Sequence, residues 1–176
     1  MTLEELGGWP FVLGRLMSGS PLTAEQAGAA LADILEGNAT SAQIAGFAVA
    51  LRLRGETVEE MAGLVATMLD FAEKVDVGAD VVDTCGTGGD RSHSINVSTI
   101  ASFVVAGAGA PVCKHGNRAA SSAAGSADVL EALGVVIDLG PAGVARCVAE
   151  AGMGFCFAPR YHAASRHAIP TRRELG

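Results

Sequence analysis

The chain has 176 residues, of which 49% are hydrophobic, so it can bury a core in one ordinary domain or two small ones and is not a disordered protein. Its formal net charge of −7 argues against a nucleic-acid-binding protein with a broad basic face, but it allows a small anionic substrate held by a few local cations. No signal peptide, bilayer-spanning apolar run or CxxC spacing is visible in the sequence. We therefore expect a cytoplasmic protein with reduced thiols and no membrane partner.

The first part of the chain predicts helices and no strands. Thr23 and Thr57 each precede a Gln or Glu by three positions, which is the pattern of a capping box at a helix start. Ser41 is placed to cap a further helix, and Gly37 and Gly55 follow helical runs at a position that glycine favours. Because this part holds no cluster of catalytic residue types, we expect it to serve packing and dimerisation. The helices are expected at 23–35, 41–54 and 57–74.

After Gly78 the pattern changes to short apolar strands that alternate with helices. Continuous apolar strands of this kind predict a parallel sheet with helices on both faces, and such sheets bind ligands at the carboxyl ends of their strands. Pro141 stands at a favoured first-turn position of one helix, and Ser126 is placed to cap another. Strands are expected at 81–82, 111–113, 135–137 and 155–157, and helices at 96–106, 126–133 and 141–151.

These patterns predict an α/β fold in two parts. A small all-helical N-terminal domain covers residues 1–77, and a parallel-sheet α/β domain covers residues 78–176. Four short strands are few for a parallel sheet, so we expect the second domain to be incomplete at its C-terminal end.

Segment 83–90 (Asp-Thr-Cys-Gly-Thr-Gly-Gly-Asp) is the first candidate for ligand binding. It places three glycines between two aspartates, directly after a predicted strand. Glycine lets backbone N–H groups approach a polyanion closely, which suits a phosphate-binding loop. The segment lacks both the Gly-Lys-Ser/Thr of a P-loop and the spacing of a dinucleotide-binding turn. Taken by itself, it fits a plain turn as well as it fits a phosphate contact.

Segment 96–99 (Asn-Val-Ser-Thr) opens an apolar helix with small hydroxyl residues. Residues of this kind are most often N-caps and nothing more. The functional interpretation has their amides and hydroxyls facing phosphate at the positive end of the helix, with the Ser98 oxygen bound to Mg²⁺ as hydroxyls are in P-loops.

Segment 114–118 (Lys-His-Gly-Asn-Arg) places two cations and an amide ahead of the small-residue run at 119–126. Lys114 is one of only two lysines in the chain and can supply a point charge for phosphate. A solvated basic loop is the alternative, as it is for the arginines near the end of the chain. His115 by itself fits a structural histidine better than a catalytic base.

These three segments, in this order, resemble those of the anthranilate phosphoribosyltransferase family, and the similarity extends over the whole chain. The helical part is similar to that family's small α domain. The resemblance implies that residues 78–176 form an α/β domain of the nucleoside phosphorylase and phosphoribosyltransferase class. Pyrimidine nucleoside phosphorylases share the architecture but carry a different lysine-and-serine signature, which is absent here. Family members are longer, and their adjacent Asp-Glu metal pair lies in a half that has no counterpart in this sequence.

The resemblance implies ligand contacts for all three segments. Anthranilate would be contacted by Gly86, Asn117 and Arg172, and Ser98 would be a ligand of Mg²⁺. Phosphoribosyl pyrophosphate would be bound by Gly86, Gly89, Asp90, Ser94, Asn96, Val97, Ser98, Thr99, Lys114, His115, Gly116, Asn117, Arg118, Ala119, Ala120, Ser121, Ser122 and Ser126.

The resemblance also implies a reaction. A homodimer would transfer the phosphoribosyl group of phosphoribosyl pyrophosphate to the amine of anthranilate and release pyrophosphate, in tryptophan biosynthesis. No nucleophile or general base is assigned, because the aromatic amine is already neutral. The alternatives are a nucleoside phosphorylase, a non-catalytic nucleic-acid-binding relative on the same scaffold, and a dimerising helical domain beside an inert partial sheet. The net charge of −7 counts against the nucleic-acid-binding alternative.

Overall fold

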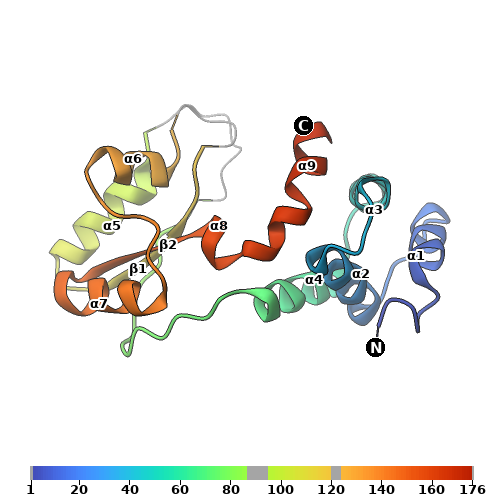
Figure 1. Ribbon diagram of the computed structural model, residues 1–176, viewed down its shortest axis with the longest axis horizontal. Coiled ribbons are helices and arrows are strands. Elements are labelled where there is room, and N and C mark those ends of the chain that lie inside the picture. Colours follow the sequence, from blue (N-terminus) through green and yellow to red (C-terminus); the bar gives the residue numbers. More distant parts are fainter. Residues whose placement is uncertain (1, 87–94, 120–123, 176) are drawn as a thin grey trace. The chain divides into compact units, whose positions relative to one another are not determined.

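The computed structural model describes residues 2–86, 95–119 and 124–175. They form two compact units, which are described separately below (Figure 1). One unit comprises Met1–Ala72 together with His162–Gly176, and the other comprises Glu73–Tyr161. Residues 162–175 therefore pack with the N-terminal helices, a return that no pattern in the sequence predicts. No helix in the described ranges is both long and apolar enough to cross a bilayer.

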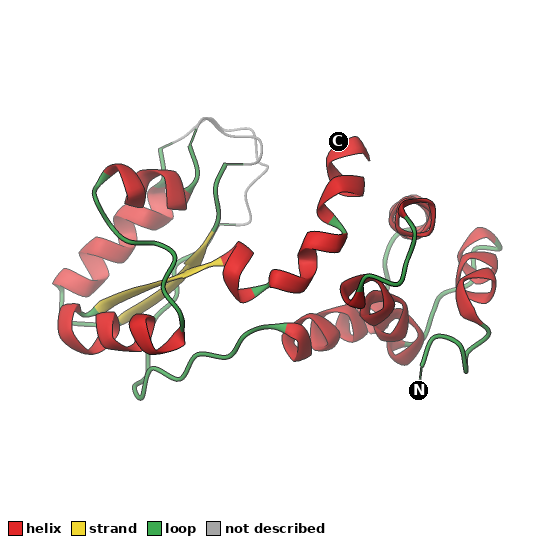
Figure 2. Cartoon of the chain, in the orientation of Figure 1, coloured by secondary structure: helices red, strands yellow, loops and turns green. Residues whose placement is uncertain are grey.

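The described residues of the first unit form helices joined by loops, without strands (Figure 2). The predicted capping boxes at Thr23 and Thr57 are confirmed, each with its Gln or Glu partner. The predicted cap at Ser41 is wrong, because Thr40 closes the capping box with Gln43 and Ser41 is already helical. The helices are α1 (Gly8–Met17), α2 (Ala24–Glu36), α3 (Ser41–Arg54) and α4 (Val58–Phe71), with the 3₁₀ turn η1 (Ala163–His167) and α9 (Ile169–Leu175) from the C-terminal segment.

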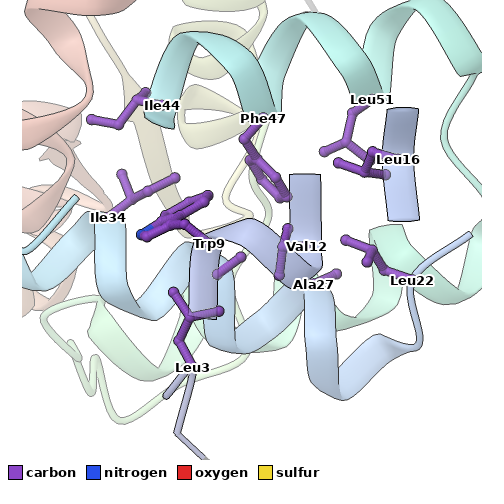
Figure 3. Close-up of a cluster of buried hydrophobic side chains, with 11 residues drawn as sticks. Leu3, Trp9, Val12, Leu16, Leu22, Ala27, Ile34, Ile44, Phe47 and Leu51 are labelled. Atoms are coloured by element: carbon purple, nitrogen blue, oxygen red, sulfur yellow. The ribbon is translucent and has the colours of Figure 1, made fainter. Parts of the chain in front are cut away.

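The core of this unit is a cluster of apolar side chains from α1, α2 and α3 (Figure 3). Trp9 meets Phe47 edge to face with ring centroids 5.9 Å apart, and its indole N–H donates to Asp33 Oδ2 at 2.8 Å. The indole therefore buries its ring without leaving its donor unpaired. Helices α2 and α4 approach closely because Gly63 faces the Ala24 carbonyl, where an added Cβ would overlap the oxygen.

A buried carboxylate, Glu60 on α4, ties three segments of the helical unit together. Its side chain is 0% exposed and pairs with the Arg54 guanidinium at the end of α3. It also accepts hydrogen bonds from the backbone N–H of Leu22 and of Thr57, each at 2.8 Å. Burial by itself would raise the pKa of Glu60, but the hydrogen bonds from Arg54, Leu22 and Thr57 outweigh it and lower the pKa to about 2.

The second unit holds a parallel sheet. Strands β1 (Val112–Gly116) and β2 (Met153–Phe157) pair in parallel, with Val112 opposite Met153 and Gly116 opposite Phe157. Val82 adds a single parallel bridge to Val112. The helices of this unit are α5 (Val97–Gly107), α6 (Ser126–Ala132), α7 (Pro141–Ala151) and the single turn α8 (Ala158–Tyr161).

Helices cover both faces of the sheet, as predicted. Successive residues of a strand point to opposite faces. On one face, Phe155 packs with Ala127 and Leu130 of α6, and on the other, Cys156 clusters with Val144 of α7. The predicted α/β class, with its helical N-terminal part, is therefore confirmed.

Two of the strand predictions are wrong in detail. Residues 135–137 form no strand, because the N–H of Val135 donates to Leu130 O to close the end of α6 and Gly134 turns the chain with φ of 83°. Ile137 is nevertheless buried against α6 and Phe155. The predicted strand at 81–82 is reduced to the one bridge at Val82.

Replacement of Glu60 by Gln should destabilise the chain by about 2–4 kcal/mol near neutral pH, because Arg54 would lose its buried counter-charge. The lowered pKa also makes stability depend on pH. Its contribution is complete above the unfolded pKa near 4.5 and is lost as pH falls towards 2. With allowance for solvent screening this loss is on the order of 2 kcal/mol.

Urea unfolding of the wild type and of Glu60→Gln, measured from pH 2 to pH 7, tests both statements. The variant should show a shallower loss of stability below about pH 4.5. Glu56→Gln, an exposed change in the loop that precedes α4, is the matched control. Parallel pH profiles for the wild type and Glu60→Gln would refute the assigned role.

Candidate active site

The candidate site lies where β1 and the bridged Val82 end. Both run in the same direction, so the residues that follow them meet at one edge of the sheet. Asp83 and Thr84 follow Val82. Lys114 and His115 lie within β1 itself, because β1 extends to Gly116 beyond the predicted end at residue 113. Continued pairing with Phe155 to Phe157 explains the longer strand.

Lys114 is buried at this edge, with a side chain that is only 1% exposed. Its ammonium donates to the carbonyl oxygen of Thr84 and to Ser98 Oγ, the latter at 3.3 Å. Thr84 Oγ1 in turn donates to Ser98 O at 2.8 Å. These three residues, here called the Lys114 clasp, join the end of the bridged strand, the first turn of α5 and β1. Burial lowers the pKa of Lys114, and the negative charge of the Asp83 carboxylate opposes that shift.

The residue before Thr84 makes a second link to β1. Asp83 Oδ1 accepts the backbone N–H of His115 at 3.3 Å, and Asp83 Oδ2 is bonded to His115 Nδ1. The sequence analysis assigns no role to Asp83. The available signal is its position directly after a strand, but its partner lies 32 residues away, and sequence spacing does not reveal such a pair.

The start of α5 is polar and partly buried. Asn96 occupies the N-cap position, but no hydrogen bond from its side chain caps the helix. Ser98 is half-buried and accepts from Lys114. Thr99 is 1% exposed, and its hydroxyl lacks a hydrogen-bond partner within the described part of the chain. The simple N-cap interpretation therefore does not account for the polar side chains of this segment.

Hydrogen bonds connect residues 117–119 with residues 125–128, the two segments that flank residues 120–123. This pair of segments is here called the neck. Asp128 Oδ2 accepts the N–H of Ala119 at 3.0 Å and the N–H of Gly125 at 2.7 Å, and Asn117 O accepts from Ala127 at 3.2 Å. Gly125, not the predicted Ser126, is the N-cap residue of α6, because Asp128 reaches back to its N–H. The hydrogen bonds from Ala119 and then Gly125 lower the pKa of Asp128.

Arg118 is already engaged by carboxylates. Its guanidinium donates to both oxygens of Glu131, at 2.5 and 2.9 Å, and to Asp128 at 3.1 Å. It also lies 5.6 Å from the centre of the Phe157 ring. Hydrogen bonds to Glu131, and then to Asp128, raise the pKa of Arg118. Arg118 thus holds the neck against α6, and its contact with phosphate stays a prediction.

The other predicted site residues fall into three groups. Gly86 and Asn117 are exposed in the second unit, near the segments described above, and Val97 is exposed on α5. Arg172 is exposed on α9 and belongs to the helical unit, so its contact with anthranilate stays a prediction. Outside the described residues lie Gly89, Asp90, Ser94, Ala120, Ser121 and Ser122.

Both units match known protein families. Residues 11–72 match the helical bundle domain of a glycosyl transferase family, and residues 78–176 match the a/b domain of that family. The second match alone covers more than half of the chain.

The similar proteins share one enzyme name. Anthranilate phosphoribosyltransferase from Salinispora arenicola is 58% identical over 172 residues, which is 96% of this chain and 49% of the relative. The enzyme of that name from Rhodococcus jostii is 60% identical over 168 residues, 96% of this chain and 46% of the relative. The chain therefore spans about half the length of the curated relatives that it matches.

Solved structures of enzymes with the same name are also similar to this chain. Anthranilate phosphoribosyltransferase (TrpD) from Thermus thermophilus superposes with a TM-score of 0.86 at 42% identity, over 94% of this chain and 50% of that one. The Saccharomyces cerevisiae enzyme in complex with PRPP and Mg superposes with a TM-score of 0.84 at 27% identity, over 96% of this chain and 51% of that one.

The neck predicts a strict requirement for glycine at position 125. An added Cβ would come within 2.6 Å of Asn117 O and would also meet the backbone of Arg118 and Ala119, none of which can swing away as a side chain could. Gly125→Ala should therefore lower the free energy of unfolding by about 1–3 kcal/mol, as measured by urea denaturation.

Gly107→Ala is the control for this change, because a Cβ there meets nothing within 4 Å. Equal stabilities for the two variants would show that the neck does not close as described.

Proposed function

We propose that this chain forms the substrate-binding half of an anthranilate phosphoribosyltransferase. The premise is that the chain belongs to the glycosyl transferase family through both of its domains. Such an enzyme transfers the phosphoribosyl group of phosphoribosyl pyrophosphate to the amine of anthranilate, in tryptophan biosynthesis. The observation that carries the proposal is the Lys114 clasp, which places a buried ammonium and a helix N-terminus at one edge of a parallel sheet.

The clasp suits a polyanionic leaving group. When the bond between C1 of the ribosyl group and pyrophosphate breaks, negative charge develops on the pyrophosphate oxygen. A fixed ammonium and helix amides in a site with little water stabilise that charge more strongly than water would. Lys114 is fixed because Thr84 and Ser98 hold its Nζ atom. Asn117, exposed at the same edge, is placed to orient the second substrate.

The first turn of α5 also fits part of a magnesium site. Ser98 Oγ already accepts from a cation, and the neighbouring Thr99 hydroxyl is buried without a partner in the described ranges. Mg²⁺ takes oxygen ligands, keeps several waters and bridges substrate phosphates, so it needs few protein ligands. Ser98 would hold the ion against the pyrophosphate, and the ion would neutralise part of the leaving charge.

Two further properties belong to the proposal. The four cysteines are free thiols, which supports a reducing compartment and hence the cytoplasm. The net charge of −7 supports a protein whose partners are small molecules and not nucleic acid.

A homodimer is supported by an apolar stripe on α4. The side of α4 that carries Glu60 and Gly63 is buried in the unit, while another face carries exposed apolar residues at helical spacing. Contiguous exposed apolar surface of this kind marks an interaction site. The stripe consists of Val58, Met61, Val65, Met68 and Leu69.

Loss of the Lys114 ammonium should weaken the binding of phosphoribosyl pyrophosphate with Mg²⁺ by about tenfold to a hundredfold, because a hydrogen bond to a charged group contributes about 1.5–3 kcal/mol. Lys114→Met keeps the apolar stem and so preserves packing. Titration calorimetry measures the change, with Lys74→Met, at the chain's other lysine, as the control.

Equal affinities for the wild type and Lys114→Met would contradict the role of the clasp. A wild-type chain that binds no phosphoribosyl pyrophosphate would contradict the proposal for these residues. Release of a base from a nucleoside in the presence of inorganic phosphate would favour a phosphorylase instead.

Val65→Glu should convert a dimer into a monomer, because a carboxylate would be buried in the apolar stripe at the subunit contact. Size-exclusion chromatography with light scattering gives the mass directly. Val136→Glu, also at an exposed valine but in the other unit, should remain dimeric. A monomeric wild type, or a dimeric Val65→Glu, would rule out this surface as the dimer contact.

A further inference from the structure

The Asp83–His115 pair has no part in the proposed function so far. Both carboxylate oxygens of Asp83 are directed at one residue, Oδ1 to the backbone N–H and Oδ2 to ring Nδ1. A surface ion pair with one contact would contribute little. Two contacts to one residue instead fix both the position of its backbone and the rotation of its ring.

The pairing determines which ring nitrogen carries the proton. A carboxylate only accepts hydrogen bonds, so the neutral imidazole must be protonated on Nδ1, which leaves Nε2 as an acceptor. The side chain of His115 is 58% exposed, so it is open to solvent and to a ligand. The same arrangement of carboxylate, imidazole and free acceptor nitrogen orients the base in hydrolytic triads.

The position of the ring connects it to the candidate site. His115 follows Lys114 in β1, and Asp83 precedes Thr84, whose carbonyl oxygen accepts from Lys114. Asp83 and Thr84, which follow Val82, thus hydrogen-bond to His115 and Lys114 of β1. Lys114 and His115 are consecutive residues of β1, so their side chains leave the strand towards opposite faces at the same edge of the sheet.

We propose that Asp83 is a positioning residue that holds His115 in the Nδ1–H tautomer, and that His115 Nε2 accepts a proton during the transfer; this rests on the proposed function. The amine nitrogen forms a bond to C1 of the ribosyl group, and the C1–O bond breaks with its electron pair on pyrophosphate. The amine then carries an excess proton, which passes to Nε2. The resulting imidazolium is stabilised by Asp83. A neutral amine needs no base before attack, but its product must still lose a proton.

The tautomer can be measured without any substrate. Long-range ¹H–¹⁵N correlation spectra of the labelled chain, recorded at about pH 8.5 where imidazoles are neutral, distinguish Nδ1–H from Nε2–H. The His115 signals are identified by their loss in His115→Gln. We expect Nδ1–H in the wild type and in Asp80→Asn, an exposed control near the same turn. Asp83→Ala and Asp83→Asn should both lose this preference and shift towards Nε2–H.

An Nε2–H ring in the wild type, or an unchanged tautomer in both Asp83 variants, would overturn the positioning role. Turnover supplies the second measurement. Asp83→Asn and His115→Gln should lower kcat by about a hundredfold with little change in KM for phosphoribosyl pyrophosphate, while Asp80→Asn should match the wild type.

The two measurements separate the inference from its premise. Unchanged kcat in both variants would overturn the proton transfer. A wild-type chain without turnover would count against the proposed function and the proton transfer together, and the spectra would still decide whether Asp83 positions His115.

Discussion

The burial of one ammonium group organises the candidate site. A lysine that is 1% exposed is costly unless its donors are satisfied, so its partners must be in place whenever the chain is folded. Here the partners are the Thr84 carbonyl and the Ser98 hydroxyl, and neither belongs to β1. Satisfying Lys114 therefore determines where the chain leaves Val82 and where α5 begins.

Two carboxylates in the second unit, Asp83 and Asp128, have similar structural roles. Asp83 and Asp128 each accept backbone N–H groups and also pair with a basic side chain, His115 in one case and Arg118 in the other. Each carboxylate therefore fixes a stretch of backbone and a basic side chain together. These contacts are made between the chain's own residues, so less of the binding free energy of the proposed ligand would be lost in ordering these side chains.

Local patterns in the sequence are sufficient to predict much of the fold. The capping boxes at Thr23 and Thr57 involve residues three positions apart, and the alternation of apolar strands with helices reflects burial on both faces of the sheet. The predictions fail where contacts between residues far apart in the sequence determine the structure. Residues 135–137 have strand composition, but the N–H of Val135 completes α6 instead. The pairing of Asp83 with His115 depends on the bridge between Val82 and Val112, which no spacing encodes.

The buried state of Lys114 is compatible with a role in binding phosphate. An ammonium has three donors, and its hydrogen bonds in the described residues use two of them, to Thr84 and Ser98. An anion bound at this edge would therefore accept from the third donor, and both hydrogen bonds of the clasp would be kept. Burial lowers the pKa of Lys114, and an adjacent phosphate would raise it again, because an opposite charge favours the protonated form. In the proposed function, ligand binding and lysine protonation would therefore reinforce each other, and the desolvation that disfavours the free ammonium would strengthen its attraction to a bound pyrophosphate.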